Sequence, residues 1–280
     1  MIVNAAGEMS GSLGGGIMEH KFVEMARDII STEKKASAIF KQVHDKAAAR
    51  NQSGMICSGE QIIFLYLLKS TDKKIIEALI ASLEKNENAT IEFKPGEIIF
   101  HPSVPDNDFL FEQNSDENFL YREKTGYKNI LHIIGGGHCS LALSKLMAEM
   151  DFYIHVYDDR PQLHTMQHNK YAHQQHIVQY GELQIKEGNN IFVVIMTVGY
   201  RTDDMALRTL KGKHFGYLGL LGSSKKIEKM MNEFKAEGIN HEWLSSIHSP
   251  IGIDIKSETP EEIAVSIAAE IIREKNKVQL

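Results

Sequence analysis

The C-terminal half of the chain alternates short apolar strands with helical patterns. The apolar runs lie at 130–134, 153–157, 191–197 and 215–221, and each is followed by apolar residues at helical spacing. Parallel strands need such crossover segments, because a tight turn only reverses the direction of a strand. The alternation therefore predicts an α/β fold, with a Rossmann-like doubly wound parallel sheet over residues 128–280.

The first of these strands runs into three glycines, in the stretch HIIGGGHCSLALSKLM. In a dinucleotide-binding turn the first glycine makes the bend and the second lets a pyrophosphate approach the backbone, while the third packs helix on strand. Gly135 and Gly137 take the first two positions, but Ser140 takes the third. His138 is placed to face a ligand over the helix N-terminus, or else it is simply hydrated. Cys139 lies in the first helical turn, where the dipole lowers a thiol pKa, although we favour a small buried side chain.

Two further features near the strand ends point to ligand binding. Asp158 ends the next strand, 23 residues beyond Gly135, which is about where a carboxylate bonds ribose hydroxyls. The alternative is an acid that ends a strand only to be solvated. In LLGSSKK, Gly222 and Ser223 form another strand-to-helix turn, and two lysines open the helix. This favours an anion site, with solvated lysines as the alternative.

Residues 1–127 predict a separate α+β domain. Two short extended pieces around a glycine precede a helix with an apolar face, and 36–45 is strand-like. The apolar run at 60–68 predicts a fully buried strand, and 88–127 predicts an antiparallel meander. The helix that begins near Thr71 is expected to bury four apolar side chains: Ile76, Leu79, Ile80 and Leu83.

Composition excludes several classes of protein. The longest apolar run, IIFLYLL, is far shorter than the roughly 20 residues that span a bilayer, and residues 1–16 lack the features of a signal peptide. The net charge is −6 and the basic residues are scattered, which argues against nucleic-acid binding. The two cysteines, Cys57 and Cys139, lie too far apart to suggest a disulfide framework. We therefore expect a cytoplasmic protein.

A histidine-rich stretch, LHTMQHNKYAHQQH, could place two imidazoles four residues apart on one helix face, as zinc binding requires. No glutamate of an HExxH motif accompanies them, so a solvated polar helix is favoured. No nucleophile triad can be assembled from the serines.

Several longer stretches resemble the XdhC/CoxI family, the accessory factors of molybdenum hydroxylases such as xanthine dehydrogenase. They are NILHIIGGGHCSLALSKLMAEMDFYIHVYDDRP, LLGSSKK and IHSPIGIDIKSETPEEIAVSIAAEII. GEMSGSLGGGIMEH and SGMICSGEQ are similar to the family's N-terminal domain.

The resemblance implies a chaperone-like maturation factor rather than an enzyme. Such a factor binds molybdenum cofactor (molybdopterin), assists its sulfuration through a sulfur donor protein, and helps to insert it into a molybdenum hydroxylase apoenzyme. The family is often homodimeric. Matching the motifs assigns Gly14, Gly15, Gly16 and Cys57 to an N-terminal site. The Cys57 thiolate would be a soft ligand for the metal or sulfur end of the cofactor, and the alternative is a small packed side chain. It assigns six residues to the Rossmann site: Gly135, Gly137, His138, Asp158, Gly222 and Ser223.

The sequence departs from the family pattern at three places. Ser140 weakens the fingerprint for NAD(P), and Val198 stands where the family commonly has histidine. The chain also begins where a preceding strand and a Ser/Pro/Gly-rich loop are expected, so we expect a truncated or late start and an incomplete N-terminal site. An NAD(P)-dependent oxidoreductase and a nucleotide-responsive partner-binding module remain as alternatives.

Overall fold

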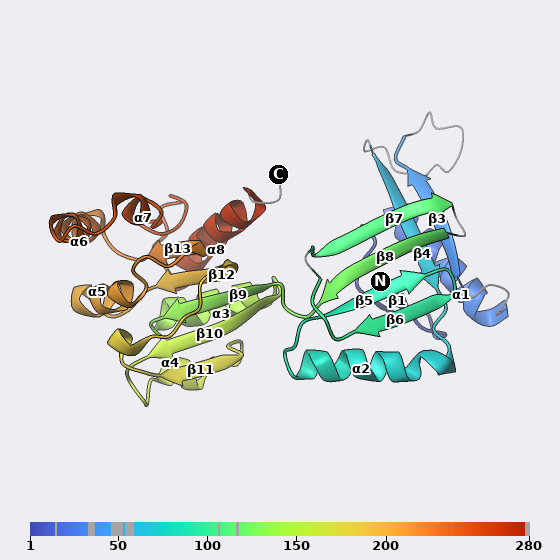
Figure 1. Cartoon of the computed structure of the whole chain (residues 1–280), viewed down its shortest axis with the longest axis horizontal. Coiled ribbons are helices and arrows are strands. Elements are labelled where there is room, and N and C mark those ends of the chain that lie inside the picture. The colour runs from blue at the N-terminus through green and yellow to red at the C-terminus, as the bar shows by residue number, and fades with distance from the viewer. Residues whose placement is uncertain are drawn as a thin grey trace. The chain divides into compact units, whose positions relative to one another are not determined.

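A computed structural model describes residues 1–14, 16–32, 37–45, 53, 59–105, 107–115 and 118–277. The chain divides into two compact units, Met1–Gly126 and Tyr127–Leu280. Figure 1 shows the elements of both.

The second unit is built on a parallel sheet of five strands. These are β9 (Asn129–Ile134), β10 (Phe152–Asp158), β11 (Gln174–Ile177), β12 (Gly188–Ile195) and β13 (Phe215–Leu220). Their order across the sheet is β11-β10-β9-β12-β13, so the chain reverses its direction of progress between β9 and β12. This is the order of the first five strands of a Rossmann fold, and it confirms the predicted Rossmann-like domain.

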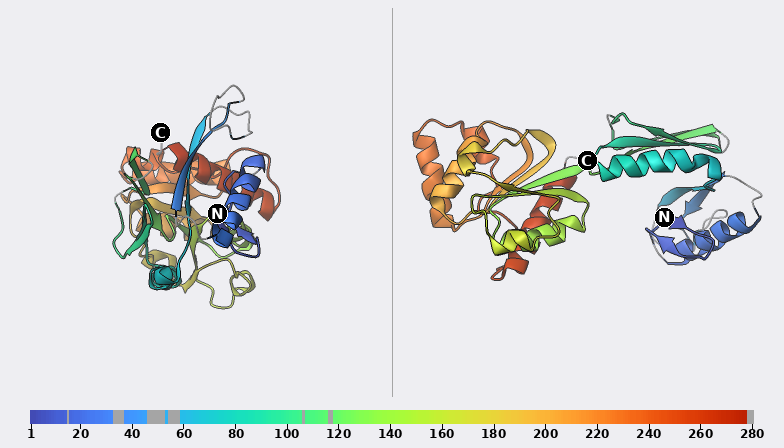
Figure 2. Two further views of the ribbon diagram at one scale, coloured as in Figure 1. Left: turned by 90° about the vertical axis from the view of Figure 1, so that its right-hand side faces the viewer. Right: turned by 90° about the horizontal axis from the view of Figure 1, so that it is seen from below.

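Helices cover both faces of this sheet, as Figures 1 and 2 show. One face packs against α3 (His138–Ala148) and α8 (Pro260–Lys277), and the other packs against α5 (Tyr200–Thr209), α6 (Ser224–Ala236) and α7 (His241–Ser245). Successive residues of β9 serve the two cores, because side chains alternate along a strand. Ile133 lies in the core under α3, and Ile134 lies in the core under α5.

In the first unit α1 (Gly16–Thr32) packs on a two-stranded hairpin of β3 (Ser37–Val43) and β4 (Glu60–Tyr66). The contact is made by Met18 and Phe22 of the helix with Ile63 of β4. The expectation of a fully buried strand was wrong for β4. Ile63 is the one residue of β4 that is fully buried, and Ile62 is 40% exposed, because a two-stranded hairpin leaves much of its surface uncovered. Before α1 lies a short hairpin of β1 (Ile2–Val3) and β2 (Met9–Ser10).

The rest of this unit is a four-stranded antiparallel sheet. Its strands are β5 (Ala89–Lys94), β6 (Glu97–His101), β7 (Phe109–Ser115) and β8 (Asn118–Thr125), in the order β6-β5-β8-β7. The predicted meander was wrong in connectivity. Two hairpins are joined through β5 and β8, because β8 returns to pair with β5.

The helix α2 (Lys73–Glu84) contacts β5 and β6, but its predicted apolar stripe is covered only in part, since Ile76 and Leu79 are half-buried. Ile80 and Leu83 are 48% and 44% exposed, and Ser82 is the buried residue of the helix. Part of the predicted stripe is therefore covered together with Ser82, and the rest of it is exposed.

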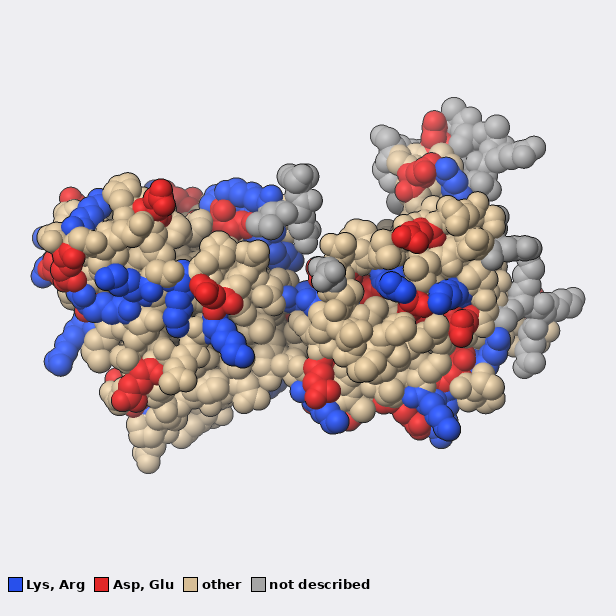
Figure 3. Space-filling model, viewed as in Figure 1, with Lys and Arg blue, Asp and Glu red and all other residues tan. Residues whose placement is uncertain are grey.

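No helix among the described residues is long and apolar enough to cross a membrane. On the face seen in Figure 3, basic and acidic side chains are interspersed in both units.

Candidate functional site

The glycine turn lies between β9 and α3, at the carboxyl end of the sheet. Gly135 has a φ of +110°, and its N–H donates to the carbonyl of Tyr157 at 2.8 Å. A Cβ at this position would lie 2.4 Å from the carbonyl oxygen of Met196, the residue after β12. The turn is therefore pressed against the loop that follows β12, and only glycine fits at its first position.

Two helices begin at the point where the strand order reverses, and neither has an N-cap side chain that accepts a helical N–H, although the Thr202 hydroxyl of α5 accepts the N–H of the N-cap residue itself at 3.3 Å. The N-cap of α3 is Gly137 and that of α5 is Gly199. By contrast, Ser223 caps α6 and Thr259 caps α8 through side-chain oxygens. The first N–H groups of α3 and α5 thus keep their hydrogen-bonding capacity for an anion.

The open side of the α3 N-terminus is at Gly137. A Cβ there would have no neighbour within 4 Å, and the next residue, His138, is exposed. These two predicted site residues therefore lie together at an accessible helix N-terminus. Cys139 does not join them, because it packs against the core under α3, where burial raises its pKa. Burial therefore outweighs the lowering of the pKa expected from the helix dipole, in agreement with the favoured prediction of a small buried side chain.

Asp158 lies next to the turn but is fully buried. It accepts the Gly136 N–H at 2.7 Å and the Arg160 N–H at 3.0 Å, and it forms a bidentate pair with the Arg160 guanidinium at 2.7 and 2.8 Å. Burial raises the pKa of this carboxyl, but the hydrogen bonds from Arg160 and Gly136 outweigh burial and lower it overall. The ribose-binding role predicted for Asp158 does not fit this geometry, because both oxygens are already engaged within the protein.

The segment after β10 folds back over the same side of the turn. Thr165, in the one-turn helix α4 (His164–Gln167), donates its hydroxyl to the carbonyl of Gly136. A Cβ on Gly136 would lie 2.5 Å from Met166 and 3.1 Å from Leu163. Protein side chains therefore fill the β10 side of the glycine turn.

The second strand-to-helix turn is closed in a different way. Lys226 forms an ion pair with the buried Asp203 of α5, and its Nζ donates to the carbonyl of Leu221 at 3.1 Å. Lys225 is exposed, in agreement with the alternative that the lysines are solvated, whereas Lys226 is partly buried. The Ser223 hydroxyl already accepts the Lys226 N–H at 3.4 Å, so this turn offers fewer open donors than the first.

The N-terminal glycine loop carries its own carboxylate. Glu19 accepts the Ser12 hydroxyl at 2.8 Å and the Leu13 N–H at 3.1 Å. Gly14 and Gly16 both have positive φ, at +105° and +69°. Gly15 and Cys57 lie outside the described residues, so their predicted roles stay predictions.

The histidine-rich stretch does not form one polar helix. The rings of His164, the first residue of α4, and His168 stack with their centroids 4.0 Å apart, but His176 lies in β11, a strand not predicted from the sequence. There His176 accepts or donates a hydrogen bond with His155 of β10 at 2.9 Å. Among the described residues, no group of three or more His, Cys, Asp or Glu side chains is arranged to hold a metal ion.

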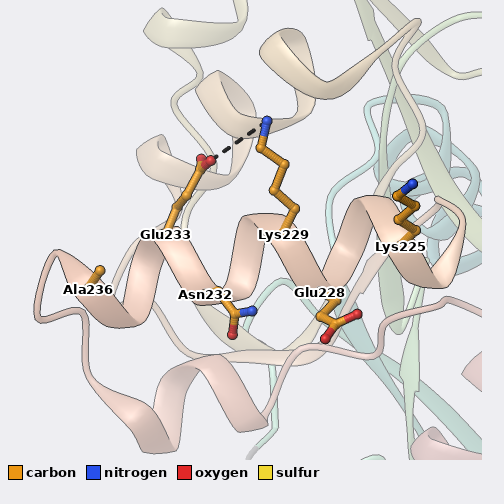
Figure 4. A pocket seen from close by; sticks show the side chains of 6 residues that line it. All are labelled: Lys225, Glu228, Lys229, Asn232, Glu233 and Ala236. Atoms are coloured by element: carbon orange, nitrogen blue, oxygen red, sulfur yellow. Dashed lines mark ion pairs between the residues drawn. The ribbon is translucent and has the colours of Figure 1, made fainter.

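A pocket of about 520 Å³ lies elsewhere, on the outer face of α6 (Figure 4). All six residues that line it come from this helix: Lys225, Glu228, Lys229, Asn232, Glu233 and Ala236. A surface made by one helix offers no converging groups, so we place the candidate site at the glycine turn.

Comparison with known proteins identifies the C-terminal unit. The family model of the XdhC Rossmann domain matches residues 131–271. YqeB, an uncharacterized protein of Escherichia coli K12, is 29% identical over 212 residues, which cover 73% of this chain and 37% of YqeB. A Bacillus subtilis protein, described as a probable xanthine dehydrogenase subunit, is 29% identical over 171 residues, which cover 60% of this chain and 48% of that protein. The chain thus spans less than half the length of these two relatives.

A solved structure from Bacillus halodurans, described as a xanthine dehydrogenase, has a similar fold. The TM-score is 0.74 at 21% sequence identity, covering 98% of this chain and 85% of that one. At this identity the likeness shows the fold alone. The family match spans half of the chain and rests on the unit that contains the glycine turn, Asp158 and the second turn. The chain belongs to the XdhC family.

Proposed function

We propose that this protein is an accessory factor of a molybdenum hydroxylase of the xanthine dehydrogenase type. In this proposal it binds molybdenum cofactor as cargo and assists its sulfuration and its insertion into the apoenzyme, together with a sulfur donor protein. Family membership supports the accessory role, and the name of the Bacillus subtilis relative suggests the enzyme class. We further propose that the protein acts as a cytoplasmic homodimer.

The observation that carries the binding proposal is the pair of helix N-termini with glycine at the N-cap, at the reversal of the strand order. The cofactor is an anionic pterin with a terminal phosphate. Backbone N–H groups at the starts of α3 and α5, whose N-caps are Gly137 and Gly199, suit that phosphate. The exposed ring of His138 is placed beside it as a further donor.

The same geometry disfavours a dinucleotide in the usual orientation. The adenosine ribose of a dinucleotide lies over the second strand and bonds the acid at its end. Here Asp158 is fully buried and held by Arg160, and Leu163 and Met166 cover Gly136. A ligand with one phosphate and one compact heterocycle needs less space on this side of the turn.

Cys57 has a separate place in the proposal. A thiolate is a soft ligand and suits the dithiolene and metal end of the cofactor, in contrast to the phosphate end. We propose it as the N-terminal contact, together with the glycines at 14–16.

The experiment is a retention assay with the full chain. Protein incubated with molybdenum cofactor is desalted, and bound pterin is measured by fluorescence and bound molybdenum by elemental analysis. We expect retention by the wild type and reduced retention by Gly137→Ala, whose added Cβ projects into the space open to the ligand. Gly181→Ala is the matched control, because its Cβ would make an ordinary 3.6 Å contact with Met205.

The outcomes separate the parts of the proposal. Retention no better than that of an unrelated protein contradicts cofactor binding, and unchanged retention by Cys57→Ala contradicts the thiol assignment alone. Calorimetry with NAD(H) and NADP(H) tests the alternative. Micromolar binding together with turnover of a hydride substrate would favour an oxidoreductase over an accessory factor.

A further inference from the structure

Three loops at the carboxyl ends of the parallel strands are joined by a buried ion pair. Asp203 of α5 is fully buried, and its Oδ1 accepts the Thr197 N–H at 3.1 Å and the Thr197 hydroxyl. Its Oδ2 pairs with Lys226 Nζ from α6. The carboxylate thus ties the loop after β12 to the start of α6.

Lys226 extends the connection to the end of β13. Its Nζ also donates to the carbonyl of Leu221 at 3.1 Å, and its side chain passes across Gly222. A Cβ on Gly222 would lie 3.1 Å from Cδ and 3.3 Å from Nζ of the lysine. Glycine at this position therefore leaves room for Lys226.

The connection reaches the glycine turn as well. A Cβ on Gly135 would lie 2.9 Å from the Thr197 nitrogen, so the turn after β9 and the loop after β12 are in close backbone contact. Val198, next to Thr197, is 74% exposed, and Gly199 is the N-cap of α5. The segment held by Asp203 is thus the one that presents the α5 N-terminus.

A buried ion pair is a weak source of stability, because desolvation of the two charges offsets most of their attraction. Its effect on geometry is more specific, since it fixes three loops at once. We propose that Asp203 and Lys226 are positioning residues, which hold Thr197, Val198 and Gly199 so that the α5 N-terminus faces the ligand. Lys226 acts through Asp203 and does not itself bind the anion. This inference rests on the function proposed above.

The first test measures cofactor affinity by titration of the full chain with molybdenum cofactor. Lys226→Met is expected to weaken binding at least tenfold, whereas Lys226→Arg, which keeps a cation able to reach Asp203, is expected to stay within about threefold of the wild type. Lys225→Met removes the neighbouring exposed lysine and should bind normally. Arg208→Met removes another α5 ion pair, with Glu237 at 2.6 Å, and should also bind normally.

Each contrary result overturns the inference. Normal binding by Lys226→Met shows that the ion pair does not position the site. A loss of cofactor affinity in Lys225→Met as large as that in Lys226→Met would indicate that both lysines bind the anion directly. An equal loss in Arg208→Met, or no rescue by Lys226→Arg, indicates an effect of general stability.

A second measurement does not depend on the ligand. Hydrogen exchange of the backbone at 196–201 is compared between wild type and Lys226→Met without cofactor. We expect Lys226→Met to exchange faster than the wild type over 196–201 and at the same rate in β9. Equal exchange of the two proteins over 196–201 would contradict the inference. Absence of cofactor binding by the wild type contradicts the proposed function instead, so the two failures are distinguishable.

Discussion

Replacement of Gly135 by alanine is expected to destabilise the C-terminal unit strongly, while the same change at Gly137 is not. Both glycines belong to one turn, but their surroundings differ. At Gly135 the φ is +110° and a Cβ would lie 2.4 Å from the carbonyl oxygen of Met196. At Gly137 the φ is −70° and a Cβ would have no neighbour within 4 Å.

The magnitude follows from two costs. A residue with a Cβ at positive φ is strained by roughly 1–3 kcal/mol. The clash also forces β9 and the loop after β12 apart, where the Met196 N–H donates to the Ile134 carbonyl at 2.8 Å, and loss of such a buried bond costs roughly 1–3 kcal/mol. The lower entropy of the unfolded alanine chain returns less than about 1 kcal/mol. We therefore expect Gly135→Ala to lower the free energy of unfolding by about 3 kcal/mol, and Gly137→Ala by less than about 1 kcal/mol.

Urea unfolding followed by tryptophan fluorescence measures this difference directly. Trp243 is the single tryptophan of the chain and is half-buried in the C-terminal unit, so its emission reports on that unit. If the two variants differ by less than about 1 kcal/mol in free energy of unfolding, the steric argument for Gly135 is wrong.

Three further predictions concern charge. Burial lowers the pKa of His132 to about 3 and that of His155 to about 4. The histidines of the unfolded chain become protonated near pH 6.5, whereas those of the native protein stay neutral at that pH. The C-terminal unit should therefore lose stability as the pH falls below 6.5, by at most about 1.4 kcal/mol per pH unit for each residue. In His132→Phe the midpoint of urea unfolding should depend less on pH than in the wild type. Arg160→Ala leaves the buried Asp158 without its cation and should cost about 2–4 kcal/mol of unfolding free energy, a loss that an unchanged urea midpoint would contradict. Burial raises the pKa of Glu92, but hydrogen bonds from Lys94 and Arg122 outweigh it and lower the pKa. The ion pairs of Glu92 should therefore stabilise the fold above the ordinary carboxyl pKa of 4.5, and this stabilisation should be lost as the pH falls below that value. Urea unfolding followed by circular dichroism should show that the loss of unfolding free energy at low pH is smaller in Glu92→Gln.

The sequence predicted the parallel sheet well, because each buried strand there is a continuous apolar run between helical patterns. It missed β11, whose residues Gln174–Ile177 are mostly polar. An edge strand pairs on one side only and needs no apolar run, so hydrophobicity gives no signal for it.

Burial in the N-terminal unit was harder to predict. The apolar stripe of α2 and the apolar run of β4 both suggested full burial, yet Ile80 and Ile62 are exposed. Periodicity shows which face of an element is apolar, but the area that neighbouring elements cover depends on tertiary packing.

At the site, residue types and positions were predictable, but hydrogen-bond partners were not. Gly135, Gly137 and His138 lie together at the turn. Asp158 lies at the expected sequence distance from Gly135, but it is paired with Arg160, for which no role was predicted from the sequence. An arginine two residues after an acid at a strand end is the signal that was available.

The most direct test of the proposed site compares molybdenum cofactor with its dephosphorylated form in the retention assay. The wild-type chain is expected to retain the phosphorylated form at least tenfold better, and Gly137→Ala is expected to lose this preference while it remains folded. Equal retention of the two forms by the wild type would contradict a phosphate site at the N-termini of α3 and α5.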